Sequence, residues 1–261
     1  MVKQRSALKI DEHGEAVMNL LNEYAVLRGG QLRRTVFAGR SEATQRRLGY
    51  TLMADLLQGG VVERVYLPSE EAVYLLGVQG RDELSKRGQK VSDPKLTAVR
   101  NSVLLHRLAI NELVLAVQID CRRHGVDSSW HLSKGAVGEA YPTGHLSIAR
   151  PGRLAAYWHA AIEPVSYQND FYNRVRAHME ASKGKERDKL PALLLLTPAA
   201  DFERLLDWLD NVIYQYPASR TTWVARLEAV REETQAGRNP LQSALWREAM
   251  WTEPEEVSLL W

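Results

Sequence analysis

Basic and polar side chains collect in one stretch of the chain, between residues 28 and 64. The candidate contact residues in this stretch are Arg33, Arg34, Arg40, Ser41, Thr44, Gln45, Arg46, Arg47, Tyr50 and Arg64. Glu42 and, further along, Asp55 are the acidic residues that oppose the arginines between residues 28 and 58. Guanidinium groups at this density suit the phosphates of nucleic acid. The stretch therefore predicts a surface that contacts nucleic acid.

The polar residues among these arginines could read the edges of base pairs. Gln45 can form two hydrogen bonds to adenine, an arginine can do the same with guanine, and Thr44 can touch the methyl group of thymine. Arg33, Arg34 and Arg40 are better placed to bind phosphates, which fixes the register of a protein on DNA but carries no sequence information. The chemistry that these residues predict is sequence-specific recognition of duplex DNA.

The elements that would position these side chains lie between Asp11 and Gly88. Hydrophobic periodicity and turn residues predict helices over 11–27, 31–37, 42–58 and 79–86 and strands over 61–67 and 72–76. Gly29-Gly30 would end the first helix, and Ser41 is a good N-cap for the third. This order is that of a winged helix-turn-helix domain, whose third helix lies in the major groove with its N-terminal residues at the base edges.

The same arginines could instead form the solvated face of a winged helix that binds protein. The tip of the wing agrees with this alternative, because Glu70 and Glu71 would repel phosphate there. We therefore expect the wing to contribute little to DNA binding beyond Arg64, near its base. The basic bias, the N-cap and the wing together favour DNA as the partner.

A long helix is expected after the winged helix. Residues 96–123 contain neither Gly nor Pro, and a basic turn at Arg122 and Arg123 is followed by Gly125 as a C-cap. The middle of this helix is apolar on most sides, which favours packing between domains or against a second subunit. Pairing two winged helices on adjacent half-sites also increases specificity. The sequence therefore predicts a homodimer.

The C-terminal half has the pattern of an α/β region followed by helices. Strands are expected over 129–132, 144–149, 155–164 and 192–196, and helices over 169–182, 201–214 and 221–251. The predicted organisation is a winged helix DNA-binding domain over 1–90, a connecting helix over 91–125, a small α/β domain over 126–217 and a helical tail over 218–261. The fold class is therefore α+β. Trp246, Trp251 and Trp261 in the tail could pack on the core or cover a partner subunit.

The composition of the 261-residue chain excludes several classes of protein. Its net charge of +2 does not by itself indicate nucleic acid, so that argument rests on local patterning. The single cysteine, Cys121, excludes an intramolecular disulfide framework and the usual clustered-cysteine zinc sites. The longest apolar stretch, 103–119, is interrupted by polar residues such as Arg107 and Glu112, which indicates a core helix and no membrane span. No secretory signal is visible, so we expect a cytoplasmic protein.

Two segments resemble the replication-relaxation family of mobile-element proteins. They are Arg46–Arg64, which ends in Leu-Leu-Gln-Gly-Gly-Val-Val-Glu-Arg, and Tyr74–Gly80. In that family a winged helix is followed by a helix that opens with a histidine, and His106 stands at that place. A region resembling a degenerate restriction-endonuclease core follows, and 141–143 and 161–163 resemble its two acidic strand motifs. The resemblance implies the same winged helix, and it adds plasmid or mobile-element replication to transcriptional control as a setting for DNA binding.

The acidic motifs depart from what a metal-dependent nuclease needs. Two carboxylates must converge on one cation, usually with a lysine nearby. Thr143 stands where the family pattern has aspartate, and residues 164–167, directly after Glu163, contain neither acid nor lysine. One isolated glutamate is a poor magnesium site. We therefore expect no catalytic residues, with an endonuclease that uses Glu163 as the alternative.

Three histidines could hold a transition metal if their strands are neighbours: His131, His145 and His159. Aromatic residues such as Trp130 lie beside them, so we interpret the histidines as packing residues and expect no metal and no other cofactor. Cys121 is interpreted as an inert core thiol, because it lies on an apolar helix.

These patterns lead to one principal hypothesis. The chain is expected to be a non-catalytic, sequence-specific DNA-binding protein that acts as a homodimer in transcriptional regulation or in plasmid or mobile-element replication. The α/β domain would serve dimerisation or bind a protein partner, and no membrane is involved. The alternatives are a metal-dependent endonuclease and a winged-helix adaptor that binds protein.

Overall fold

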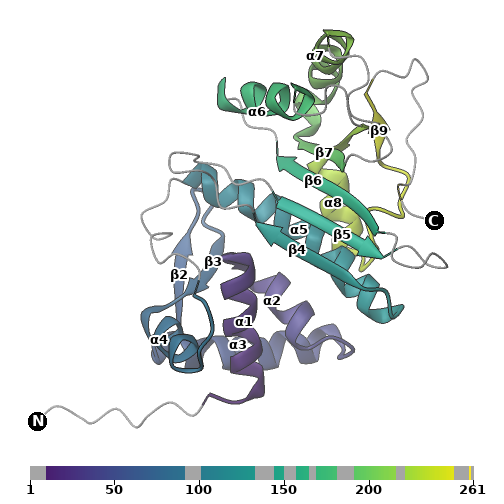
Figure 1. The fold of residues 1–261 in the computed structure, drawn as a ribbon. Coiled ribbons are helices and arrows are strands. Elements are labelled where there is room, and N and C mark those ends of the chain that lie inside the picture. Colours follow the sequence, from purple (N-terminus) through teal and green to yellow (C-terminus); the bar gives the residue numbers. More distant parts are fainter. Residues whose placement is uncertain are drawn as a thin grey trace, which may run out of the picture. The chain divides into compact units, whose positions relative to one another are not determined.

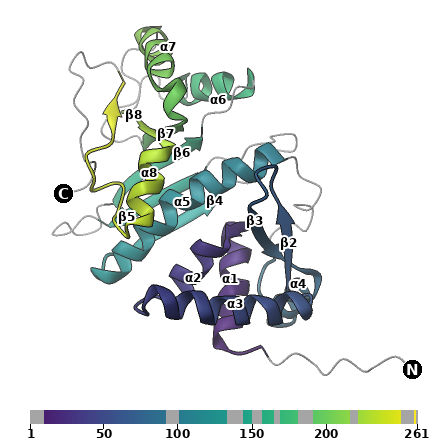
Figure 2. The same ribbon diagram turned by 180° about the vertical axis from the view of Figure 1, so that it is seen from behind.

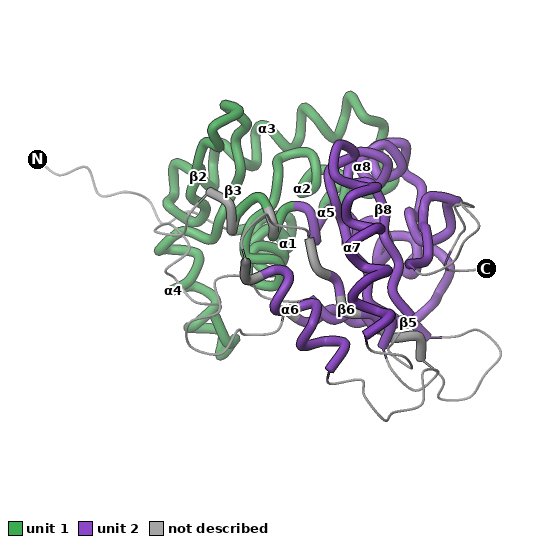
Figure 3. The backbone as a smooth tube through the Cα atoms, turned by 90° about the horizontal axis from the view of Figure 1, so that it is seen from above, with its two compact units in different colours: residues 1–108 green, residues 109–261 purple. Residues whose placement is uncertain are grey.

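The chain has an α+β fold, as the sequence predicts, and divides into two compact units. The computed structural model describes residues 10–91, 101–132, 144–149, 157–164, 169–180, 191–215, 221–249 and 259. Unit 1 comprises residues 1–108 and unit 2 residues 109–261 (Figure 3). Each unit is built on a sheet of its own.

Unit 1 consists of helices and a small antiparallel sheet (Figure 1). Its elements are α1 (Glu12–Tyr24), β1 (Val26–Arg28), α2 (Gly29–Val36), α3 (Glu42–Gln58), β2 (Val62–Tyr66), β3 (Ala72–Leu76), α4 (Val78–Lys86) and the first residues of α5 (Asn101–Arg123). The strands are ordered β1-β3-β2, and both neighbouring pairs are antiparallel. The expected order of three helices, a hairpin of two strands and a closing helix is confirmed.

The first helix is shorter than the sequence predicts, and a strand follows it. α1 ends at Tyr24, Ala25 adopts a positive φ of 67°, and β1 then pairs with β3. The prediction of a helix as far as Leu27 is therefore wrong, because a short apolar run fits a buried strand as well as a helix. Gly29-Gly30, which we expected to end this helix, instead begin α2.

One face of the small sheet packs against the start of α5. Val26, Val73 and Leu75 of the sheet form a buried cluster with Leu104 and Leu108 of α5. Removing an aliphatic side chain of this size from water stabilises a fold by about 1.5–3 kcal/mol. This packing is the reason why the first residues of α5 belong to unit 1.

α3 begins and ends where the sequence predicts. Ser41 is its N-cap, and the backbone N–H of Gly59 donates to the carbonyl of Asp55 at the other end. Gly60 then turns the chain towards β2 with a positive φ of 70°, a conformation that favours glycine. Gly77, directly before α4, lies against this turn, since a Cβ atom at Gly77 would be 2.3 Å from the carbonyl oxygen of Gly60. α4 therefore starts close to the end of α3.

Unit 2 is built on a mixed sheet whose strands follow one another in sequence order, from β4 to β9. Beside the rest of α5, its elements are β4 (Ser128–Leu132), β5 (Gly144–Ala149), β6 (Tyr157–Pro164), α6 (Asn169–Glu180), β7 (Ala192–Thr197), the 3-10 helix η3 (Ala199–Asp201), α7 (Phe202–Gln215), β8 (Thr222–Arg226), α8 (Leu227–Gln235) and β9 (Arg247–Glu248). β6, β7 and β8 run parallel, and the remaining neighbouring pairs are antiparallel.

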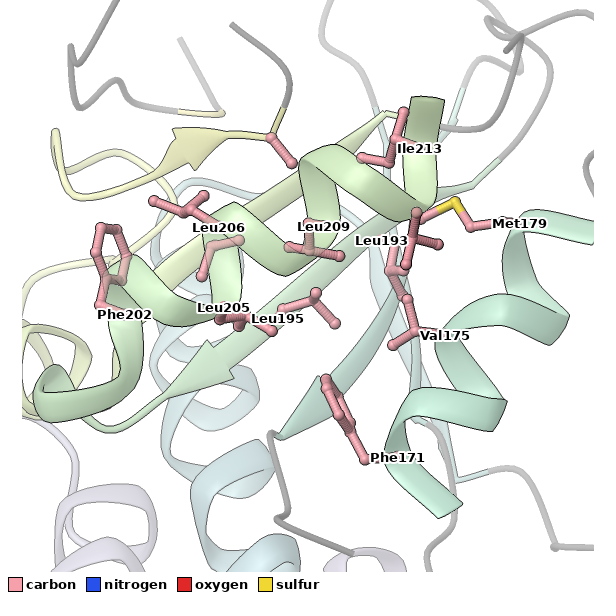
Figure 4. Packing of buried hydrophobic residues seen from close by; sticks show 13 residues of the cluster. Phe171, Val175, Met179, Leu193, Leu195, Phe202, Leu205, Leu206, Leu209 and Ile213 are labelled. Atoms are coloured by element: carbon pink, nitrogen blue, oxygen red, sulfur yellow. The ribbon is translucent and has the colours of Figure 1, made fainter. Parts of the chain in front are cut away.

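Helices cover both faces of this sheet. α6 and α7 lie on one face, and α5 and α8 lie on the other, which is turned towards the viewer in Figure 2. Under α6 and α7, Phe171 and Val175 pack with Leu193 and Leu195 of β7 and with Leu209 of α7 (Figure 4). β7 is buried along its whole length, as is usual for a parallel strand covered on both faces.

The prediction of a helical tail over residues 218–261 is wrong, because part of this segment forms strands. β8 enters the sheet beside β7, and β9 pairs with β8. Only α8 is helical in the described part of this segment after residue 221. Trp246 is fully buried, and its indole N–H donates to the carbonyl of Pro240 at 2.8 Å. This tryptophan packs on the core, whereas Trp251 and Trp261 lie outside the described residues.

α5 has the predicted C-terminal end. Arg122 and Arg123 form its last turn, and Gly125 follows with a positive φ of 65°. Residues 96–100, where we expected it to start, lie outside the described residues. The buried carboxylate of Glu112 accepts a hydrogen bond from the hydroxyl of Thr234 on α8 at 2.8 Å. Neither α5 nor any other helix in the described part of the chain is both long enough and apolar enough to cross a membrane.

Candidate nucleic-acid interface

The turn between α2 and α3 is held by the polar residues at the start of α3. The backbone N–H of Thr44 donates to the hydroxyl oxygen of Ser41 at 3.4 Å, and the two hydroxyl groups are 2.9 Å apart. The side-chain amide of Gln45 donates to the carbonyl of Arg40 at 3.0 Å. Three of the predicted contact residues thus have a structural role, which fixes where α3 begins.

Arg46 and Arg47 lie exposed in the first half of α3. Arg46 forms an ion pair with Glu42, one turn earlier, at 2.5 Å. Both partners are largely exposed, and an exposed ion pair of this kind contributes at most about 1 kcal/mol to stability. A phosphate or a base could therefore replace Glu42 as the partner of Arg46. Arg47 has no ion pair with another described residue. Both guanidinium groups are therefore available to a ligand.

Arg33 lies across α3, although it belongs to α2. A Cβ atom at Gly49 would lie 2.3 Å from Cγ and 2.5 Å from Cδ of Arg33, so the aliphatic part of this arginine occupies the space that a side chain would need. Its guanidinium carbon lies 5.3 Å from the centre of the Tyr50 ring, within the range of a cation–π interaction. Arg33 and Tyr50, both predicted contact residues, are thus brought together on α3.

Arg64 lies on the hairpin, where its guanidinium carbon is 5.2 Å from the centre of the Tyr66 ring. Its backbone is directly opposite Tyr74 of β3. At the tip of the hairpin, the Nε–H of Arg28 donates to the carboxylate of Glu71 at 2.8 Å. This ion pair offsets the charge of Glu71, one of the two glutamates that we expected to repel phosphate there.

Sequence reasoning missed the residues that hold the predicted arginines in place. Gly49, Tyr66 and Tyr74 did not stand out, because a glycine inside a helix and tyrosines in a strand carry no signal of their partners. Arg34 is half-buried on α2, and its Nη1 atom is 3.6 Å from the position of a Cβ atom at Gly30. The spacing of the arginines along the chain was the only signal that pointed to this surface.

The strands that carry the three histidines are neighbours in the sheet of unit 2. His131 of β4 and His145 of β5 are directly opposite each other, and the backbone of His159 in β6 is opposite Ser147. The side chains of His131 and His145 are exposed, so the prediction that they are packing residues is wrong for this pair. Among the residues whose side chains the structure describes, no three His, Cys, Asp or Glu side chains are grouped to hold a metal ion.

The two positions considered for a nuclease are Thr143 and Glu163, and the structure describes only the backbone of Glu163. Thr143 is outside the described residues, and the backbone of Glu163 in β6 is opposite Leu195. Cys121 is buried near the end of α5, and burial raises the pKa of its thiol. A raised thiol pKa lowers the thiolate fraction, which agrees with an unreactive core cysteine.

Known proteins resemble the chain at the level of a family model. No curated protein and no solved structure matches the chain significantly. The family model described as replication-relaxation matches residues 18–143, which span α1 from Met18, the whole of the turn and hairpin described above, and α5. Over residues 18–143, the chain is therefore similar to the replication-relaxation family.

Proposed function

We propose that the chain is a sequence-specific DNA-binding protein that acts in the replication or relaxation of plasmids or other mobile elements, or in transcriptional control. The family match supports a setting in replication or relaxation. The order of helices and hairpin in unit 1 supports the interpretation of this unit as a winged helix-turn-helix. In such a domain α3 is the helix that enters the major groove.

The observation that carries the proposal is the division of α3 into two faces. Its buried residues are Gly49, Met53 and Leu56. Its exposed residues in the same span include Ala43, Arg46, Arg47, Tyr50 and Ala54, which recur at steps of three and four and so form one stripe. The exposed stripe is basic in its first half and small at its end. Apart from Tyr50, the stripe carries no bulky apolar residue that would keep the helix from base edges.

The predicted residues divide into two roles in this proposal. Arg46 and Arg47 reach the base edges, where an arginine can bind guanine through two hydrogen bonds. Arg33, Arg40 and Arg64 bind phosphates on either side of the groove. Ser41 and Gln45 act mainly by holding the turn, although the carbonyl oxygen of the Gln45 amide can still accept a hydrogen bond.

Unit 2 is proposed to have a non-catalytic role, as a platform for a second subunit or another protein. The apolar residues of α5 that suggested a dimer, among them Leu108, Leu113 and Val117, are already buried in the single chain. The dimer therefore rests on a different argument: one winged helix contacts few base pairs, and pairing on adjacent half-sites adds specificity. Its interface would lie outside α5.

Selection from a random duplex library, followed by fluorescence anisotropy, tests the proposed function. We expect enrichment of a defined sequence, and binding to that sequence should be at least about a thousandfold tighter than to random DNA. The affinity should fall steeply with salt, because each phosphate contact releases counterions. A protein-binding adaptor would enrich no sequence and would not shift DNA at low salt.

A further inference from the structure

Arginine and tyrosine side chains alternate on the exposed face of the hairpin. The Arg64 guanidinium lies over the ring of Tyr66, 5.2 Å from its centre. Tyr74 is directly opposite Arg64 in the neighbouring strand, so their Cβ atoms are about 4.5–5.5 Å apart on the same face. The hairpin therefore presents a ring, a guanidinium and a second ring in succession.

The alternation continues from the hairpin onto α2 and α3. Tyr74 and Arg33 both lie over Gly29, since a Cβ atom there would be 3.2 Å from Cε2 of Tyr74 and 3.4 Å from Nη1 of Arg33. Arg33 in turn lies 5.3 Å from the centre of the Tyr50 ring. The residues of this arginine–tyrosine row are, in spatial order, Tyr66, Arg64, Tyr74, Arg33 and Tyr50.

The two ends of the arginine–tyrosine row are open to solvent. Tyr66 is 57% exposed and Tyr50 is 66% exposed, whereas Tyr24, which belongs to the core of the same unit, is 1% exposed. Each of these two rings contacts an arginine: Tyr50 contacts Arg33, and Tyr66 contacts Arg64. The row thus offers aromatic faces and positive charge together, and no acidic residue belongs to it.

Aromatic rings and guanidinium planes in one row fit a single nucleic-acid strand. Bases stack on aromatic side chains in a way that tolerates any sequence, and neighbouring arginines bind the phosphates between them. The bases of a duplex are stacked on one another, so only unpaired bases can use such rings. We propose that the arginine–tyrosine row binds the unpaired bases of a DNA strand that continues beyond the duplex held by α3. This inference rests on the proposed function, because α3 must first bind the duplex.

A comparison of two DNA ligands tests the inference on the full chain. One is a blunt duplex with the selected sequence, and the other is the same duplex with a single-stranded overhang of about eight nucleotides, within the site sizes of single-strand-binding folds. We expect the overhang to tighten binding on the order of tenfold, which corresponds to one stacked base. Tyr66→Ala should remove this gain, so that the two ligands bind this variant equally, whereas Tyr66→Phe should keep the gain.

Tyr214→Ala is the matched control, because Tyr214 of α7 is also exposed, at 83%, and lies in unit 2. It should leave both affinities unchanged. Equal affinity of the wild-type chain for the two ligands, or a gain that survives in Tyr66→Ala, would overturn the inference and leave the proposed function standing. Absence of binding to both ligands would overturn the two together.

Discussion

Arg33 of α2 crosses α3 at Gly49, where a Cβ atom would lie 2.3 Å from Cγ of the arginine. The contact joins α2 and α3 through the aliphatic part of the Arg33 side chain, which carries its charge at the far end. Because the guanidinium then lies beside Tyr50, the glycine determines where the positive charge is presented. Gly49 is thus a positioning residue for Arg33.

Gly49→Ala should weaken DNA binding through Arg33. We expect the slope of log affinity against log salt concentration to fall by about 1, the value for one phosphate contact, on selected and random DNA alike. Arg33 must change rotamer to make room for the new methyl group, and the preference for Ala over Gly inside a helix, about 1 kcal/mol, opposes the cost of that change. In an Arg33→Ala background, Gly49→Ala should have no further effect on DNA binding. Additive effects of the two changes would show that Gly49 does not act through Arg33.

Arg46→Ala should reduce specificity more than general affinity. We expect a cost of about 1–3 kcal/mol on the selected sequence and a much smaller cost on random DNA, both measured by fluorescence anisotropy. Arg123→Ala, which removes an exposed arginine from the end of α5, serves as the control for net charge. Equal losses on both DNA ligands would assign Arg46 to a phosphate, and no loss on either would remove this part of α3 from the interface.

Purified protein should not cut DNA. The motif that would need two carboxylates has Thr143 in place of one of them, so incubation of plasmid and single-stranded DNA with magnesium or manganese should leave both intact. Glu163→Gln should leave DNA affinity nearly unchanged. Cleavage by the wild-type chain that disappears in Glu163→Gln would replace the non-catalytic proposal by an endonuclease.

Helices that begin or end with a typical capping residue were predictable from the sequence. Ser41 as an N-cap, Gly125 as a C-cap and the apolar periodicity of α3 depend on residues close in sequence, so the sequence alone was sufficient. β1 and β8 were missed, since their identity as strands depends on pairing with β3 and β7, which lie elsewhere in the chain. A short apolar segment can form either a helix or a strand, and the strand beside which it packs decides between them.

The candidate site was predictable by residue type but not by contact. The density of arginines between residues 28 and 64 identified the surface. No pattern in the sequence could reveal that Gln45 donates to the Arg40 carbonyl, or that Arg28 forms an ion pair with Glu71, between β2 and β3. These contacts change the interpretation of single residues: Gln45 becomes a structural residue of the turn, and Glu71 is no longer an uncompensated charge.

The chain should form a dimer in solution if winged helices are paired on adjacent half-sites. Light scattering at micromolar concentration should then give twice the 29.5 kDa mass of one chain. Addition of a duplex with the selected sequence should give a complex of two chains per DNA molecule. A mass near 29.5 kDa without DNA, together with one chain per duplex, would contradict the dimer.

Glu233 of α8 should make the stability of unit 2 sensitive to acid. Arg238 donates two hydrogen bonds to its carboxylate, at 2.6 and 2.8 Å, and Ser243 donates another. These bonds, with those from Arg238 foremost, lower the pKa of Glu233 from 4.5 to about 2. The folded state therefore favours the ionised form. The stabilisation is fully present above pH 4.5 and is lost as the pH falls towards about 2.

Glu233→Gln should therefore lower the melting temperature at pH 7, and the difference from the wild-type chain should shrink below about pH 4.5 and vanish near pH 2. Thermal unfolding followed by circular dichroism at a series of pH values measures this difference. Glu232→Gln is the control, because Glu232 lies on the same helix with an exposed side chain and should give no such trend. A difference between Glu233→Gln and wild type that is constant over the whole pH range would show that the carboxylate charge contributes nothing.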